Sequence, residues 1–131
     1  MRIDLDTSVA AVGVPANAPE YARPFEDAPA GSPPSCAVAF RGIGDETAPL
    51  DFDRFKAVVG ELRERDWQQS GGLRERETLD GVIGEAHAIL KQRGWTVSVQ
   101  YGIAEKTSAI TLTAYDEACM KRSGADASPL G

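Results

Sequence analysis

Two cysteines are the residues whose type and position predict a specific covalent chemistry. Cys36 opens a short expected strand at residues 36–40, and Cys119 follows the last expected strand at residues 109–115. If these strands are antiparallel neighbours, the two Cα atoms can approach within the roughly 4.4–6.8 Å that a disulfide requires. We therefore predict a Cys36–Cys119 disulfide, a bond typical of proteins outside the cytoplasm. The alternative is two unrelated thiols.

Metal binding and catalysis find little support among the remaining residue types. Two sulfurs 83 positions apart and one distant histidine do not form a metal-ligand set. His87 is the only histidine, so a catalytic unit with a serine or cysteine nucleophile would have to use it. We expect His87 on the flank of a helix, where nothing in the sequence brings a nucleophile to it. We predict no catalytic residue, cofactor or metal ligand.

An acidic run precedes the first expected helix of the domain. Carboxylate oxygens clustered on a loop can hold calcium, but this run lacks the spacing and central glycine of an EF-hand loop. Carboxylates at the start of a helix also stabilise the positive end of its dipole without any metal, and we favour this interpretation. The residues are Asp45, Glu46, Asp51 and Asp53.

Arginines on both sides of a tryptophan form the best candidate for binding a partner. An arginine stacked on an indole can hold an anionic group through cation–π and bidentate contacts. The alternative is a solvated helix face with ion pairs, such as Glu61 with Arg65 one turn on, and tryptophans that anchor the core. The candidate partner-binding residues are Arg41, Arg65, Trp67, Arg74 and Arg76.

Charge and hydropathy narrow the class of protein. The 131 residues include 14 Lys and Arg against 20 Asp and Glu, a net charge of −6, which argues against nucleic-acid binding. No run of 18 apolar residues occurs, so we expect no membrane span. Asp4 and Asp6 stand where a secretory signal would need apolar residues, so no export signal is visible.

Composition divides the chain into three parts. Residues 1–35 contain six of the eight prolines in an alanine-rich background, and we expect them to form an extended N-terminal arm. Residues 36–120 are the expected α+β domain. Residues 121–131 are polar, and we expect a flexible tail.

Apolar periodicity predicts the elements of the domain. A helix at residues 52–65 is expected to be capped by Asp51, and a second helix at residues 79–93 to end at Gly94. Trp67 is expected to start a short strand, and residues 95–101 and 109–115 alternate as a hairpin. With the strand at 36–40, the order is β-α-β-α-β-β. This predicts a two-layer sandwich, two helices on a small, mainly antiparallel sheet with a wet, Thr-rich outer face.

One segment carries a loose resemblance. Residues 90–119 (LKQRGWTVSVQYGIAEKTSAITLTAYDEAC) resemble the C-terminal part of small exported or lipid-anchored proteins of actinomycete bacteria, which end a helix in Gly-Trp, continue with a hairpin and finish at a cysteine. The resemblance implies an extracytoplasmic location, secreted or at the cell surface, rather than an activity. The chain departs from it by lacking a leader. That fits if Met1 begins a mature form; otherwise the chain is expected in the cytoplasm.

These observations favour a non-catalytic, extracytoplasmic protein-binding module or accessory protein. Its expected partner is another protein, with no nucleic acid and no cofactor. One alternative is a small cytosolic enzyme or accessory protein with a pocket near the loop at residues 68–77. Another is an immunity-type inhibitor of a protein partner, which small size and acidity also fit.

Overall fold

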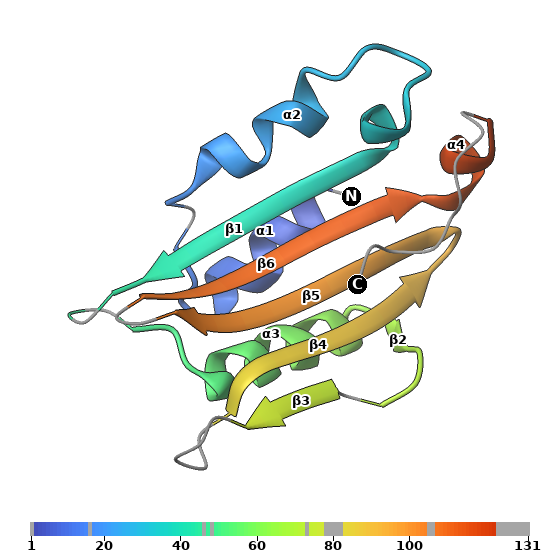
Figure 1. The fold of residues 1–131 in the computed structure, drawn as a ribbon. Helices are drawn as coiled ribbons and strands as arrows, with labels where there is room; N and C mark the ends of the chain where they lie inside the picture. Colours follow the sequence, from blue (N-terminus) through green and yellow to red (C-terminus); the bar gives the residue numbers. More distant parts are fainter. Residues whose placement is uncertain are drawn as a thin grey trace.

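The computed structural model describes residues 2–15, 17–45, 47, 49–72, 74–77, 83–104 and 107–122. Within this part, a single antiparallel sheet has one face covered by two helices, α1 (Arg2–Ala11) and α3 (Phe52–Glu64) (Figure 1). The strands are β1 (Ala37–Gly44), β2 (Gln68–Gln69), β3 (Arg74–Glu77), β4 (Ile83–Gln92), β5 (Trp95–Ala104) and β6 (Thr107–Asp116). Short helical segments are η1 (Pro19–Tyr21), α2 (Arg23–Glu26), η2 (Pro33–Cys36) and α4 (Glu117–Arg122).

The strands lie in the order β1-β6-β5-β4, and β2 and β3 both pair with the outer side of β4. Successive side chains along a strand point to opposite faces of the sheet. On the helix-covered face, the long strands present apolar residues that pack on α1 and α3. These core residues include Phe40, Ala88, Leu90, Val97, Val99, Ile110 and Leu112 from the sheet, and Leu5, Val9, Phe55, Val58 and Leu62 from the helices.

Helix α3 confirms the prediction for residues 52–65. The side chain of Asp51 accepts a hydrogen bond from the Arg54 backbone N–H at 2.9 Å, so it satisfies one of the donors left free at a helix start. Phe55, Val58 and Leu62 recur at helical spacing and are fully buried against the sheet. The predicted hairpin is also present, as β5 and β6.

The second predicted helix, at residues 79–93, is wrong. Residues 83–92 form β4, which pairs with β5 over its length, while residues 78–82 lie outside the described part. Ala86, Ala88 and Leu90 alternate into the core. Ala86 and Leu90, four residues apart, also fit one face of a helix, but Ala88 would lie on the opposite side of such a helix. Arg93 and Gly94 both have positive φ, 47° and 82°, as a two-residue hairpin turn requires. The glycine therefore marks a hairpin and not a helix end.

The fold is a mixed α+β structure, but the predicted order β-α-β-α-β-β and the small sheet with two helices are wrong. The expectation of an extended N-terminal arm is wrong as well, because residues 2–11 form α1 and residues 19–26 form η1 and α2. The prolines begin only at Pro15, and before it Leu5 and Val9 lie one turn apart and are buried. This segment therefore supplies a helix to the core.

The N-terminal segment also closes the outer edge of β1 (Figure 1). The Asn17 side-chain amide donates to the Ile43 carbonyl at 2.7 Å, and its oxygen accepts from the Ile43 N–H at 2.7 Å. These two bonds replace those of a neighbouring strand. Close by, the backbone of Pro15 and the side chain of Val14 lie against Gly42, where an added Cβ would stand 2.6 Å from the Pro15 carbonyl oxygen.

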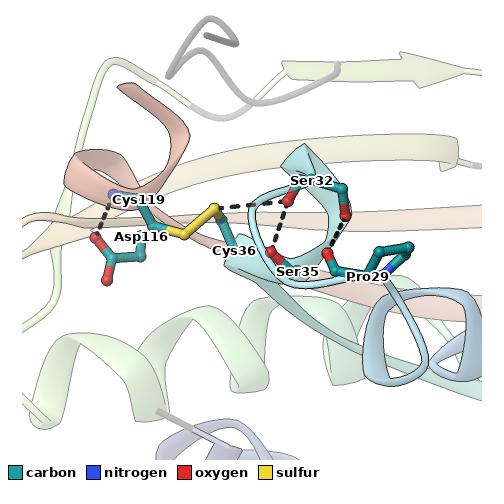
Figure 2. The surroundings of a disulfide bond; sticks show 6 residues. All are labelled: Pro29, Ser32, Ser35, Cys36, Asp116 and Cys119. Atoms are coloured by element: carbon teal, nitrogen blue, oxygen red, sulfur yellow. Dashed lines mark hydrogen bonds between the residues drawn. A yellow bond between two sulfur atoms is a disulfide. The ribbon is translucent and has the colours of Figure 1, made fainter. Parts of the chain in front are cut away.

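The predicted Cys36–Cys119 disulfide is present, with a Cα–Cα distance of 5.5 Å (Figure 2). Because β1 and β6 are antiparallel neighbours, the start of β1 lies beside the end of β6, as the prediction required. Figure 2 shows Cys119 on α4, where its N–H donates to the Asp116 carboxylate at 3.2 Å. The bond ties η2 to α4 beside a small apolar cluster that contains Tyr115 and Met120.

Replacing Gly42 by alanine should destabilise the protein, because the added methyl group must displace the N-terminal segment from β1. We expect the free energy of unfolding to fall by about 1–3 kcal/mol in urea unfolding. Gly60, on the exposed side of α3 with open space around it, is the matched control. Gly60→Ala should stabilise by about 0.5–1 kcal/mol. Equal effects at the two sites would contradict the close contact at Gly42.

Removing the disulfide should lower the free energy of unfolding, because the unfolded chain then has more conformational entropy. The bond joins residues 83 positions apart, and the loop-entropy account gives about 4 kcal/mol for a loop of this size. We expect Cys36→Ser/Cys119→Ser to lose about 2–4 kcal/mol in urea unfolding. Intact mass after alkylation, with and without reduction, checks the bond itself. Two thiols alkylated in folded, unreduced protein would contradict it.

Candidate functional site

A hollow of about 510 Å³ lies in the sheet and reaches from β1 to β3. We call it the arginine hollow. Its floor is formed mainly by the face of the sheet opposite α1 and α3, and its walls carry most of the charged residues that this face presents. Its lining residues are Arg41, Arg74, Glu75, Arg76, Glu85, Ala86, His87, Gln100, Tyr101, Gly102, Ala109 and Thr111.

Strand register places the polar side chains of the hollow in one row. Arg41 on β1 lies opposite Thr111 on β6, which lies opposite Gln100 on β5. Gln100 in turn lies opposite His87 on β4, and His87 lies opposite Arg74 on β3. Directly opposed residues share a face of the sheet, so five polar side chains line up across five strands.

The neighbouring row explains why the surface is hollow. It runs Ile43, Ala109, Gly102, Glu85 and Arg76, again through directly opposed residues. Its middle positions carry a methyl group and a hydrogen, so little side-chain volume fills the centre of the face. The hollow is therefore a consequence of Gly102 and Ala109 standing between longer side chains.

The arginines at the two ends of the hollow differ in what they contact. The Arg41 Nε donates to Thr111 Oγ1 at 3.1 Å, and its guanidinium lies 4.0 Å from the centre of the Tyr21 ring. These contacts hold Arg41 in place. Four strand spacings of about 4.8 Å separate it from Arg74, about 19 Å along the sheet. A small anion therefore cannot contact both ends.

The β3 end of the hollow is the more available one for a ligand. Arg76 forms an ion pair with Glu85 at 3.6 Å, but the two side chains are 77% and 60% exposed, so the pair contributes little stability. Arg74 is exposed and makes no ion pair with any residue in the described ranges. Both arginines stand two residues apart on one face of β3. They are spaced to bind carboxylates together.

His87 lies between this end and the centre of the row. Its Nε2 is 2.7 Å from Ser98 Oγ on β5. Partial burial, and secondarily the nearby charge of Arg74, lower the His87 pKa from its ordinary value of 6.5. The ring is therefore neutral at pH 7. Ser98 is only 3% exposed, so its oxygen is a partner that positions the ring and is not presented to a substrate.

Three of the five predicted partner-binding residues line the hollow, Arg41 at one end and Arg74 and Arg76 at the other. The other two do not reach it. Trp67 is 2% exposed and packs in the core, in agreement with the alternative that the tryptophans anchor the core. Arg65 directly follows the last residue of α3, and its side chain forms an ion pair with Glu61 of that helix.

Gln100 and Thr111 line the hollow but are not among the residues predicted from sequence, and His87 lies on β4 and not on the predicted helix. The alternation of the predicted hairpin already put Gln100 and Thr111 on its polar face, so their register was the available signal. The alignment of His87 and Arg74 with them depends on β4, whose residues fall within the helix predicted at residues 79–93. The row is therefore visible only when β4 is recognised as a strand.

The acidic run lies away from the hollow. Asp51 caps α3, and Asp45 accepts hydrogen bonds from the Thr47 N–H and hydroxyl at 3.0 and 2.7 Å. Glu46 lies outside the described residues. Within the described ranges, no three His, Cys, Asp or Glu side chains gather as metal ligands.

A second depression, of about 600 Å³, lies between α1, η1, α2 and β1. Its deeper apolar residues are buried, while Ala10 and Pro19 at its rim are exposed. This depression therefore reflects the packing of the N-terminal segment on β1. The buried residues include Val9, Val14, Ala18, Ala39 and Phe40.

Comparisons of the chain with known protein families, curated proteins and solved structures find no match. Among the residues that the structure describes, no helix is long and apolar enough to cross a membrane. The geometry of the arginine hollow is thus the basis for a functional proposal.

The titration of His87 tests the geometry of the hollow. We expect NMR to give a pKa below 6.5 and, in Arg74→Gln, a pKa closer to 6.5, because one nearby positive charge is gone. Arg63→Gln, an exposed change on α3, should leave the His87 pKa unchanged.

The same shift sets the sign of a pH dependence. Because the unfolded chain binds the proton more readily, the contribution of neutral His87 to the free energy of unfolding is fully present above pH 6.5. This contribution falls as the pH drops below 6.5, and it stops changing below the folded-state pKa. His87→Gln should remove this step from urea unfolding measured against pH. A His87 pKa at or above 6.5 would contradict the burial described.

Proposed function

We propose that the protein is a non-catalytic, extracytoplasmic protein-binding module whose arginine hollow binds an acidic segment of a partner protein. The observation that carries this proposal is the pair Arg74 and Arg76. They stand on one face of an exposed edge strand and line the hollow, and Arg74 has no carboxylate partner among the described residues.

Charge supports an acidic partner. The chain as a whole has a net charge of −6, yet three arginines against two glutamates line the hollow. A guanidinium binds carboxylate groups through paired hydrogen bonds, and Gln100 and Thr111 add neutral polar groups on the floor. Arg74 and Arg76, two residues apart on β3, suit a segment that carries more than one carboxylate better than a small ion.

The disulfide supports a location outside the cytoplasm. Structural disulfides form and persist in oxidising compartments and are rare where glutathione and thioredoxin keep thiols reduced. Cys36 is 3% exposed, so the bond is protected from solution on one side and suits a structural role better than a catalytic one.

The hydrogen bond between His87 and Ser98 favours a second candidate, a small enzyme that uses the hollow. A neutral histidine beside a serine is the core of a nucleophilic pair. Burial of Ser98 counts against it, because a nucleophile must reach its substrate. Hydrolysis of a p-nitrophenyl ester that His87→Gln abolishes would establish this candidate in place of the binding module.

Binding of a glutamate hexapeptide tests the proposed function. We expect the peptide to shift the amide NMR signals of Arg74, His87 and Gln100, and binding to weaken with added salt. Arg74→Gln/Arg76→Gln should lose about tenfold or more in affinity, because two charged hydrogen-bonding groups are removed.

The matched control is Arg63→Gln/Arg93→Gln, which removes the same charge from exposed positions outside the hollow. This control should bind the peptide as the unchanged protein does. Equal loss in both double variants would show a general charge effect, and no signal shift in the unchanged protein would refute the proposal.

A further inference from the structure

The two edges of the sheet differ in whether their outward-facing backbone groups already have partners. At β1, the Asn17 side chain occupies both the N–H and the carbonyl of Ile43, and Val14 and Pro15 lie against Gly42. A strand from another molecule cannot pair there without displacing the N-terminal segment.

At the other edge, β3 is open. It pairs with β4, and no other strand in the described ranges pairs with it, so it forms the lower margin of the sheet in Figure 1. Arg74, Glu75 and Arg76 are all exposed. Half of the backbone N–H and carbonyl groups of such a strand point away from the sheet and are available to an added strand.

A second copy of this chain is a poor occupant of that edge. When two copies of one strand pair antiparallel in a continuous sheet, the two-fold axis is perpendicular to the sheet, so each residue opposes one from the same face. Arginine would then oppose arginine, and Glu75 would oppose a glutamate. Like charges directly opposite one another destabilise a strand pair.

We propose that the acidic segment binds as an added strand along β3, with acidic residues at every second position, opposite Arg74 and Arg76. This inference rests on the proposed function and specifies the form of the partner. Residues between the acidic ones lie on the other face of the sheet, opposite Glu75, where neutral or basic side chains fit. The register shift between Arg76 and Glu77 limits the paired stretch to a short one.

Two hexapeptides of equal composition test the alternation, Glu-Thr-Glu-Thr-Glu-Thr and Glu-Glu-Thr-Thr-Glu-Thr, the second of which has no two glutamates two positions apart. We expect the alternating peptide to bind about fivefold more tightly, because only it places carboxylates opposite both arginines. It should also slow hydrogen exchange of amides within residues 74–77. A fully N-methylated alternating peptide keeps the charges but loses the N–H groups, and it should not give this protection.

The outcomes separate the two proposals. Equal binding of both peptides in the hollow without protection of β3 would overturn strand addition and leave the acidic-segment proposal standing. No binding of either peptide would overturn both. Dimerisation that protects the β3 amides without peptide would show that a second copy takes this edge and would overturn the assigned partner.

Discussion

The pairing register of β4, β5, β6 and β1 is the constraint on which the rest of the structure depends. The two-residue turn at Arg93 and Gly94 fixes how β4 pairs with β5, and this pairing puts His87 opposite Gln100. A slip of one residue would exchange the two faces of β4, exposing Leu90 and burying His87. The same register that builds the core therefore also builds the arginine hollow.

Sequence patterns predicted the elements whose signals are local. The Asp51 cap with its buried helical stripe, the alternating hairpin, and the cysteines at two strand ends all describe features present in the fold. The α+β class and the disulfide follow from them. Each of these signals lies within one element or at the ends of two expected neighbours.

Patterns failed where the deciding interaction lies elsewhere in the fold. Alanines at positions 86 and 88 fit either a helix or a strand, and pairing with β5 decides between them. The six prolines of residues 1–35 favour an extended segment, although Leu5, Ser8 and Val9 mark a buried helical face ahead of them. The arginines of the hollow can be proposed from the sequence. Their alignment with His87 can be predicted only if residues 83–92 are recognised as a strand.

The closure of β1 by Asn17 also decides what kind of assembly the sheet can enter. A sheet with two unlike open edges can join the first edge of one molecule to the second edge of the next, and this head-to-tail addition continues without limit as a filament. Because the side chain of Asn17 already occupies Ile43, only the edge at β2 and β3 remains among the strands that the structure describes. The proposed strand addition would therefore end after a single event, and its expected product is a discrete complex.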